Sequence, residues 1–449
     1  MGLRALARIA FAAATLAATP AFAAPDAPAA APPVAASSDT IRYQVRQGDN
    51  LFALARSYLR NIGDYRAIQK LNRVSSPYQL PVSQYLTVPK SLLRFTPIEA
   101  HVLAWRGDVR ITRGGRTVAT AVDAVVREGD MLQTGANAFV SLGLPDDSVI
   151  ALPSQSQLRV ARLRQYVLNA IVERQFDVLS GRARGVVEPL KKAQDDFRFV
   201  TPSAVSAVRG TELRVAYDPT SQRGATEVLE GHVSVEGAAR AVMVDAGRGV
   251  VAGAGGPGEP VALLPAPTLI RPGIVQDADD LAFTVEPVTG AKSYHVQIAR
   301  DAGFLDVVSE VDTGPLVVMP TVEEGGWFVR VSGVDDNGLE GIPRTYSFKR
   351  RRNVIETETS VKKTGRYEEY LFRWRSSGSG RLQYRFQLSR EGQGEVPLID
   401  EIGLTTRGLV VTDLPPGSYT WRVLTSQFVE GELNQKWSPP QTMTISADE

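Results

Sequence analysis

The three histidines are the first side chains to test for metal or acid–base chemistry, because the sequence contains no cysteine. His101, His232 and His295 lie far apart and form neither an HxH nor an HExxH pattern, the spacings that hold zinc in many peptidases. The absence of cysteine also removes thiolate ligands, disulfides and cysteine nucleophiles. These residues predict no metal cofactor.

Two short motifs contain fragments of known catalytic or metal sites. Residues 360–365 hold SxxK and KTG fragments like those of penicillin-binding enzymes, but both use Lys363, whereas those enzymes need two separate lysines. Residues 335–338 (DDNG) lack the twelve-residue calcium spacing and predict a hairpin turn. A glycosidase with two catalytic carboxylates stays open from sequence alone. The patterns together favour a protein that is not an enzyme.

A glycine-rich stretch has the spacing of a dinucleotide-binding loop. Gly253, Gly255 and Gly258 match GxGxxG, but Pro257 lies inside the pattern and no helix follows. We interpret residues 253–265 as a Gly/Pro linker and predict no nucleotide cofactor.

The composition indicates a folded chain of several domains. It has 449 residues, more than one hydrophobic core normally supports. Its 50 lysines and arginines are balanced by 49 aspartates and glutamates, so no net charge favours a nucleic-acid partner. Short runs of strand-forming residues separated by turn residues predict a mainly β, multidomain fold.

The N-terminus has the order of an export signal. Arg4 and Arg8 precede an apolar stretch, residues 9–18, that is too short to span a bilayer, and small residues follow at 21–23. We predict a signal peptide over 1–23 that is cleaved after Ala23, with an uncleaved anchor as the alternative. Residues 24–40 form an Ala/Pro linker. No later apolar run is long enough for a transmembrane segment in the mature chain.

Residues 41–90 predict a strand, two helices and a closing strand. Ile41, Tyr43 and Val45 alternate with polar residues, the period of a half-buried strand. In the first helix the apolar residues recur on one face: Leu51, Leu54, Ala55, Tyr58 and Leu59. The second helix is expected to bury Ala67, Ile68 and Leu71, and residues 85–88 form the closing strand.

This stretch resembles the LysM module through YQV (43–45), GDNL (48–51), Asn72 and QYLTVP (84–89), with Ser83 where the family usually has glycine. The resemblance implies binding of N-acetylglucosamine polymers, peptidoglycan or chitin, in a shallow groove between two loops. Carried over residue by residue, the glycan-binding candidates are Gly48, Asp49, Asn50, Leu51, Phe52, Ser75, Ser76, Tyr78, Gln79 and Leu80. A ring such as Tyr78 can stack on a sugar. The alternative is the same fold with a groove that does not bind.

Residues 99–252 predict short strands about every ten residues, with 158–172 open between a strand pair and a short helix. The segment TPSAVSAVRGTEL (201–213), with its flanking turns, resembles the FecR domain. Asp147 replaces a usual glycine and tolerates the left-handed conformation. Arg209 is either a ligand-facing charge or a structural donor to carbonyls, and the residue type favours the structural role. The family's cytoplasmic helical region and membrane span are absent from the matching position, which argues against direct sigma-factor regulation.

The last 185 residues contain an internal repeat. SYHVQIAR (293–300) matches QYRFQLSR (383–390), and GWFVRV (326–331) matches SYTWRV (418–423). The two copies, 266–350 and 354–447, resemble fibronectin type III sandwiches. We expect Trp327 and Trp421 to be buried at equivalent places and the basic run 349–352 to be a solvated linker rather than a polyanion site.

These patterns predict an exported, non-catalytic scaffold or adaptor in the periplasm, with wall or outer-membrane association left open. Its LysM-like module binds peptidoglycan glycan strands, and its FecR-like and sandwich domains contact unidentified envelope proteins. The alternative function is a periplasmic signalling protein whose FecR-like domain relays a partner's signal.

Overall fold

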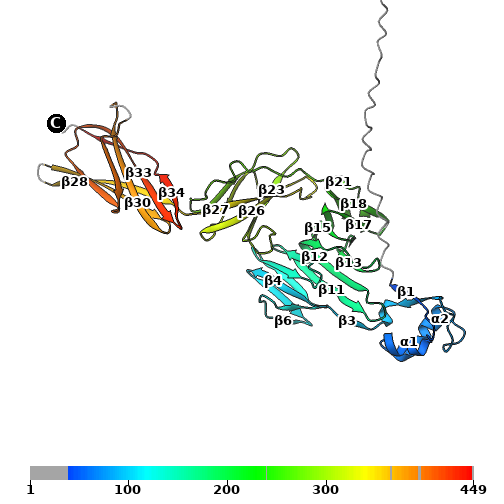
Figure 1. Ribbon diagram of the computed structural model, residues 1–449. Helices are drawn as coiled ribbons and strands as arrows, with labels where there is room; N and C mark the ends of the chain where they lie inside the picture. The colour runs from blue at the N-terminus through cyan, green and yellow to red at the C-terminus, as the bar shows by residue number, and fades with distance from the viewer. Residues whose placement is uncertain (1–38, 239, 365–366, 393–395, 447–449) are drawn as a thin grey trace, which may run out of the picture. The chain divides into compact units, whose positions relative to one another are not determined.

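The computed structural model describes residues 39–238, 240–364, 367–392 and 396–446. The expected signal peptide, 1–23, and nearly all of the expected linker, 24–40, lie outside the described residues. None of the helices in the described ranges is long and apolar enough to cross a membrane. We name four regions by their sheets and cores (Figure 1): the N-terminal module, the central β domain, the first sandwich and the second sandwich.

The N-terminal module has the predicted strand–helix–helix–strand order. Its elements are β1 (Thr40–Gln44), α1 (Leu51–Tyr58), the 3-10 turn η1 (Ile62–Asp64), α2 (Tyr65–Leu71), β2 (Tyr85–Pro89) and the 3-10 turn η2 (Lys90–Leu92). β1 and β2 pair antiparallel, and Tyr43 lies opposite Leu86. The alternating residues of both strands and the apolar face of α1 are buried together in one core. The period-2 and period-3.6 patterns therefore predicted this module correctly.

The second helix differs from the prediction. Ile68 is buried, but Ala67 is exposed and Leu71 is 51% exposed. The polar residue Asn72 holds this end of α2 instead. Its Nδ2 donates to the carbonyls of Ile68 (2.8 Å) and Thr87 (2.9 Å), and its Oδ1 accepts from the Thr87 amide (2.6 Å). One amide side chain thus bonds an edge of the two-stranded sheet that no third strand covers.

Ser83 stands where the LysM family usually has glycine, and it adopts φ 67°. The left-handed conformation costs an L-residue about 1–2 kcal/mol. We expect Ser83→Gly to raise the module's free energy of unfolding by about 1 kcal/mol, because glycine relieves that strain while giving up some chain entropy. Hydrogen exchange of the β1 and β2 amides measures the change. Asp147→Gly, also at positive φ (67°), is the matched variant in another domain and should leave these amides unaffected. Unchanged or faster exchange in Ser83→Gly would contradict the expected gain.

The central β domain is a continuous set of paired strands that closes on itself. The strands are β3 (Phe95–Pro97), β4 (Ala100–Arg106), β5 (Val109–Arg113), β6 (Arg116–Val118), β7 (Val125–Val126), β8 (Met131–Thr134), β9 (Phe139–Gly143), β10 (Val149–Leu152), β11 (Gln157–Tyr166), β12 (Val172–Val187), β13 (Asp196–Val200), β14 (Val205–Val208), β15 (Thr211–Asp218), β16 (Arg223–Glu230), β17 (His232–Glu236), β18 (Ala241–Asp245), β19 (Arg248–Gly253), β20 (Gly256–Pro257) and β21 (Val261–Ala262). Phe176, Phe197 and Phe199 pack in its core with ring centroids 5.6–5.9 Å apart.

Two segments that the sequence left open or assigned to a linker belong to this domain. The stretch 158–172 is strand β11 followed by a turn into β12. The stretch 253–265 is not a free linker, because β20 and β21 both pair with β19. Gly256, at φ 91°, lets the chain turn back so that Pro257 lies opposite Ala252. The domain therefore extends past residue 252.

Asp147 adopts φ 67°, and Arg209 donates to the Ala193 carbonyl, the structural role that its residue type favoured.

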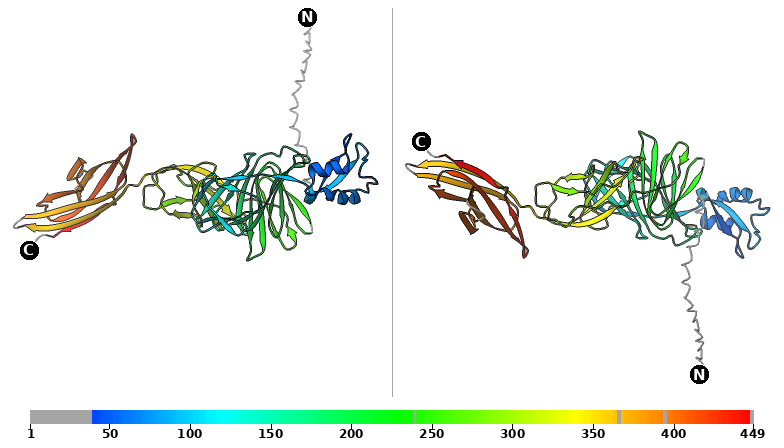
Figure 2. Two further views of the ribbon diagram at one scale, coloured as in Figure 1. Left: turned by 90° about the horizontal axis from the view of Figure 1, so that it is seen from below. Right: turned by 90° about the horizontal axis from the view of Figure 1, so that it is seen from above.

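The repeat at the C-terminal end forms two sandwiches, each built from two sheets. The first contains β22 (Leu281–Thr284), β23 (Ser293–Ala299), β24 (Val307–Thr313), β25 (Leu316–Met319), β26 (Gly325–Val334) and β27 (Arg344–Arg350). The second contains β28 (Val354–Thr364), β29 (Tyr367–Ser377), β30 (Arg381–Arg390), β31 (Ile399–Leu404), β32 (Gly408–Thr412), β33 (Gly417–Val429), β34 (Glu432–Trp437) and β35 (Gln441–Ile445). Figure 2 shows the two layers of strands in the second sandwich.

Trp327 and Trp421 are both buried, at 5% and 1% exposure, but their positions are not equivalent. Trp421 lies opposite Leu388, and the residue opposite the matching Ile298 is Val329. Trp327 instead corresponds to Tyr419. The matching arginines support this register, since Arg300 lies 5.3 Å from the Trp327 ring and Arg390 lies 5.9 Å from the Tyr419 ring. The expectation that the two tryptophans occupy equivalent positions was therefore wrong, because Trp421 corresponds to Val329, two residues after Trp327.

The basic run 349–352 is a bonded junction and not the solvated linker that we expected. Arg350 is fully buried and donates to the Gln276 carbonyl (2.9 Å), the Asp279 carbonyl (2.8 Å) and the Thr321 hydroxyl (2.6 Å). Arg351 forms an ion pair with Glu430 of the second sandwich (2.7 Å). Carbonyl and hydroxyl oxygens accept from both Nη atoms of the buried Arg350 guanidinium, while its Nε has no hydrogen-bond partner among the described residues.

The N-terminal module is packed on the central β domain through a shared core and a buried ion pair. Tyr166 and Ile171 of the central domain complete the module's hydrophobic core. Beside them, Glu173 accepts from Lys90 Nζ (3.1 Å) and the Tyr166 hydroxyl (2.5 Å). The module that contains the two predicted binding loops is therefore packed directly against the central β domain.

This junction predicts a pH dependence. Burial opposes ionisation of Glu173, but Tyr166 and Lys90 outweigh burial and lower its pKa. A carboxyl with a lowered pKa in the folded state stabilises the fold above its unfolded pKa of about 4.3, and this contribution is lost as pH falls through the lower folded value. We expect Glu173→Gln to destabilise the junction by about 1–3 kcal/mol at pH 7 and by progressively less below pH about 4. Denaturant titrations of both proteins between pH 7 and 3 measure the difference, and a pH-independent difference would contradict it.

Candidate glycan-binding groove

The two loops that the sequence assigned to the groove lie side by side. The Leu51 amide, in the first turn of α1, donates to the Pro77 carbonyl of the second loop at 2.8 Å. An N-terminal helix amide has no partner inside its helix, so this bond uses a free donor to join the loops. The structure therefore brings the predicted segments 48–52 and 75–80 together.

In the first loop, three of the predicted residues hold the loop in shape. Asp49 Oδ2 accepts from the Tyr43 hydroxyl (2.8 Å) and the Arg46 amide (2.7 Å), while Asn50 Oδ1 caps α1 by accepting from the Ala53 amide (2.8 Å). Burial and the bond to Asp49 raise the pKa of Tyr43 to about 12. Leu51 is 1% exposed and belongs to the core. The side chains of Asp49, Asn50 and Leu51 therefore hold the shape of the loop.

Gly48 lies at the open end of this loop. It is exposed, adopts φ 88°, and has no atom within 4 Å of the place where a Cβ would lie. The backbone is accessible here, and the conformation itself requires glycine. A bulky substitution at 48 would change the loop as well as obstruct it, so it is a poor probe of binding.

The second loop offers more exposed groups. Ser76 Oγ accepts from the Tyr78 amide at 3.4 Å, and the Ser76 carbonyl accepts from the Gln79 amide at 3.4 Å. Leu80 packs against the module's core. Ser75, Tyr78 and Gln79 are exposed. Among the predicted residues of this loop, these three are free to contact a ligand.

Three aromatic rings contact one another in a row, which we call the aromatic shelf: Tyr65 at the start of α2, Phe52 in the first loop and Tyr78 in the second. Phe52 stacks on Tyr78 with centroids 5.2 Å apart at 24°, and contacts Tyr65 in a tilted arrangement with centroids 4.4 Å apart at 36°. Tyr78 is 69% exposed. Sequence reasoning missed Tyr65, although a tyrosine directly after the Asp64 helix start was a visible signal.

The arrangement suits an uncharged ligand with flat apolar faces and polar edges. A pyranose ring presents C–H groups that pack on an aromatic face, while its hydroxyl and N-acetyl groups can bond to loop backbone. Across the described ranges, no group of three or more His, Asp or Glu side chains is placed to hold a metal ion.

Two of the four regions match models of known protein families. Residues 43–89 match the LysM domain model, and residues 130–234 match the model of the FecR protein family. The chain therefore contains a LysM domain, which is the N-terminal module, and a FecR domain within the central β domain. No curated protein sequence matches the chain.

Comparison with solved structures finds distant similarity to three kinds of protein. Two crystal structures of a putative anti-sigma factor from Parabacteroides distasonis are 17% and 18% identical, with TM-scores of 0.25 and 0.24 over 29% of this chain. This chain spans only 57% of that protein's length. Fibronectin(III)-like modules of Clostridium thermocellum CbhA are 11% identical over 40% of this chain and 94% of theirs, with a TM-score of 0.19. A cytokine receptor complex is 14% identical over 40% of this chain and 97% of its own, with a TM-score of 0.23.

Proposed function

We propose that this protein is an exported, non-catalytic adaptor that binds N-acetylglucosamine-containing strands of peptidoglycan through its LysM domain. The observation that carries the proposal is the aromatic shelf at the two LysM loops, where Tyr78 is 69% exposed and stacked on Phe52. An exposed tyrosine held by a second ring loses little conformational freedom on binding, so it is a ready platform for a sugar.

The LysM match occurs once, over residues 43–89, so we expect binding by a single chain to be weak. We expect a dissociation constant on the order of 10–1000 μM. Many repeated sites on one glycan strand still retain the protein at the wall, because a released chain meets the next site at high local concentration.

The other domains present surfaces for protein partners in the envelope. The central β domain, with its FecR match over 130–234, and the two sandwiches would contact envelope proteins whose identity the chain does not reveal. In this proposal the signal peptide is removed and the mature chain works in the periplasm, associated with the wall or the outer membrane.

A second candidate function is a periplasmic signalling protein. The observation in its favour is the junction between the LysM and FecR domains, where Tyr166 and Ile171 enter the LysM core. A glycan-induced change in the LysM domain could reach the FecR domain through these contacts. Glycan-dependent protection of β11 and β12 amides from hydrogen exchange would favour this function.

Co-sedimentation of the whole chain with purified peptidoglycan sacculi tests the main proposal. We expect the protein to pellet with sacculi and to be released by N-acetylglucosamine oligomers, but not to pellet with cellulose, which lacks the N-acetyl group. Deleting residues 41–90 would be a poor control, because it would expose Tyr166 and Ile171 of the LysM core. A chain that stays in the supernatant with sacculi would refute the proposal.

A further inference from the structure

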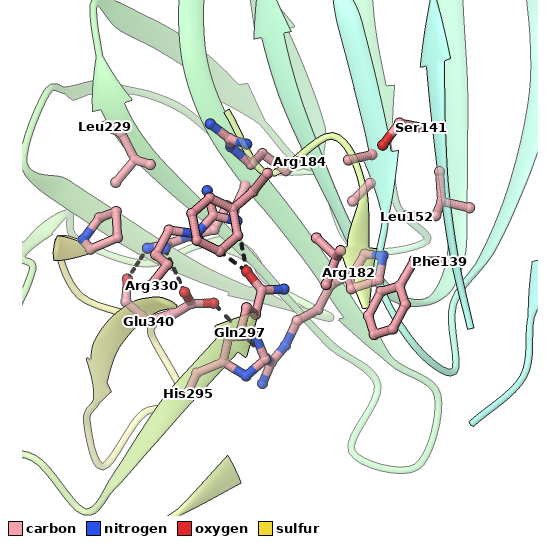
Figure 3. A pocket seen from close by; sticks show the side chains of 17 residues that line it. Phe139, Ser141, Leu152, Arg182, Arg184, Leu229, His295, Gln297, Arg330 and Glu340 are labelled. Carbon is pink, nitrogen blue, oxygen red and sulfur yellow. Dashed lines mark hydrogen bonds and ion pairs between the residues drawn. The ribbon is translucent and has the colours of Figure 1, made fainter. Parts of the chain in front are cut away.

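A cavity of ≈ 50 Å³ lies between the central β domain and the first sandwich (Figure 3). The contact around it is well bonded: Ser141 Oγ donates to the Leu305 carbonyl (2.7 Å), and the Ser154 amide donates to Glu310 (3.0 Å). The space is large enough for more than one water-sized group. It is distinct from the LysM groove.

The central domain contributes three arginines to the lining of the cavity, and each of them lies within ion-pair distance of at least one carboxylate. Arg184 pairs with Glu212 at 2.7 Å, and Arg214 bonds Glu227 and Glu340, both at 2.6 Å. Arg182 lies 3.9 Å from the second oxygen of Glu340. The acids that pair with these arginines are therefore already in ion pairs. Glu340, which belongs to the first sandwich, also accepts from the Ser332 hydroxyl at 2.6 Å.

The sandwich contributes a fourth arginine, Arg330, and none of the described carboxylates lies within ion-pair distance of it. Its Nε and Nη2 donate to the neutral Gln297 Oε1 at 3.3 and 2.6 Å, and its guanidinium lies 4.1 Å from the Phe304 ring centroid. Burial and the Arg184 guanidinium lower its pKa to about 9. Glu340 and Glu212 attract this guanidinium from a greater distance, but neither forms a direct ion pair with it.

The second sandwich contains the same pair of side chains. Arg422 donates to Gln387 Oε1 at 3.0 and 2.9 Å and lies 4.2 Å from the Trp437 ring. Arg422 is exposed, so water screens its charge. The Gln–Arg pair belongs to the repeat, and only in the first sandwich does the central domain enclose it.

The rest of the wall is apolar. Phe139, Phe304 and Val307 pack together at the contact, and Leu152 lines the same cavity. A ligand that complements both parts of the wall needs an anionic head and a short hydrocarbon tail. A carboxylate matches the planar guanidinium of Arg330 in shape and charge.

We propose that this cavity binds a small carboxylate with an apolar tail, its head on Arg330 and its tail against Phe139, Phe304 and Val307. The head neutralises Arg330 and is further attracted by Arg184. The site is independent of glycan binding, because its residues belong to the central domain and the first sandwich.

Isothermal titration of the whole chain with butyrate tests the site, with butyramide and inorganic phosphate as comparison ligands. We expect butyrate to bind, butyramide not to bind, and phosphate to bind at least tenfold more weakly, because it lacks a tail. Arg330→Gln should weaken butyrate binding at least tenfold. Arg422→Gln, the equivalent change in the second sandwich, should leave it unchanged.

Arg330→Lys keeps the charge but loses the planar fork, so binding should fall between wild type and Arg330→Gln. If Arg330→Gln does not fold, weaker butyrate binding by Arg330→Lys is the test of whether Arg330 holds the carboxylate. Three results would overturn the proposal: no butyrate binding to wild type, equal binding of butyrate and butyramide, or wild-type binding by the folded Arg330 variants.

Discussion

Trp421→Ala is expected to unfold the second sandwich while the first stays folded. Trp421 is 1% exposed, and its ring lies 5.0 Å from Phe372 and 5.8 Å from Phe386 in the centre of that core. Truncating a buried tryptophan removes its transfer energy and leaves a cavity, with a cost of about 3–5 kcal/mol. The first sandwich has its own core, so the loss should stay local.

Trp421→Phe separates packing from hydrogen bonding. Trp421 Nε1 has no hydrogen-bond partner in the described part of the chain, so phenylalanine retains most of the packing and gives up no bond. We expect this variant to cost under about 1.5 kcal/mol. Hydrogen exchange of β30 and β33, compared with β23 and β26, locates the loss. Equal loss in both sandwiches would show that they form one cooperative unit.

Arg214→Met is expected to destabilise the contact between the central domain and the first sandwich by about 3–5 kcal/mol. Arg214 lies between Glu227 and Glu340, which are 4% and 7% exposed. Burial opposes ionisation of Glu340, but Arg214, His295 and Arg182 outweigh it and hold its pKa well below the usual range. Without Arg214 the two buried carboxylates lose the cation that directly contacts both of them, the costly case for a buried ion pair.

Arg240→Met is the matched control for this variant. Arg240 pairs with Glu259 at 2.8 Å, but both side chains are largely exposed, and such a pair contributes at most about 1 kcal/mol. Denaturant unfolding of the three proteins compares the free energies. Similar losses for the buried and the exposed arginine would mean that the network does not hold the domains together.

The features that could be predicted from sequence are those encoded by local pattern. The alternation of Ile41 and Tyr43 and the apolar face of α1 both depend on neighbours a few residues away. The loops at 48–52 and 75–80 were placed correctly because family spacing carries their positions. Tyr78 stacks on Phe52, and its role in sugar binding stays a prediction.

The features that could not be predicted depend on contacts between distant residues. We expected Arg350 to be solvated because the carbonyls of Gln276 and Asp279 that accept its hydrogen bonds are more than seventy residues away in the sequence. The pairing of β20 and β21 with β19 was hidden by glycine and proline, which usually indicate a linker. The mismatch between Trp327 and Trp421 could be seen only from the strand pairing, in which Val329, and not Trp327, lies opposite Ile298.

The central claim is that the aromatic shelf binds glycan, and titration of Tyr78→Ala with N-acetylglucosamine oligomers tests it most directly. Tyr78 is exposed and stacks only on a neighbouring ring, so its loss should leave the fold intact and weaken binding at least tenfold. Tyr85→Ala is the matched control, because Tyr85 is 50% exposed on strand β2, where Arg42 lies 4.5 Å from its ring. The account predicts wild-type affinity for Tyr85→Ala and at least tenfold weaker binding for Tyr78→Ala. Wild-type affinity in a folded Tyr78→Ala protein would contradict it.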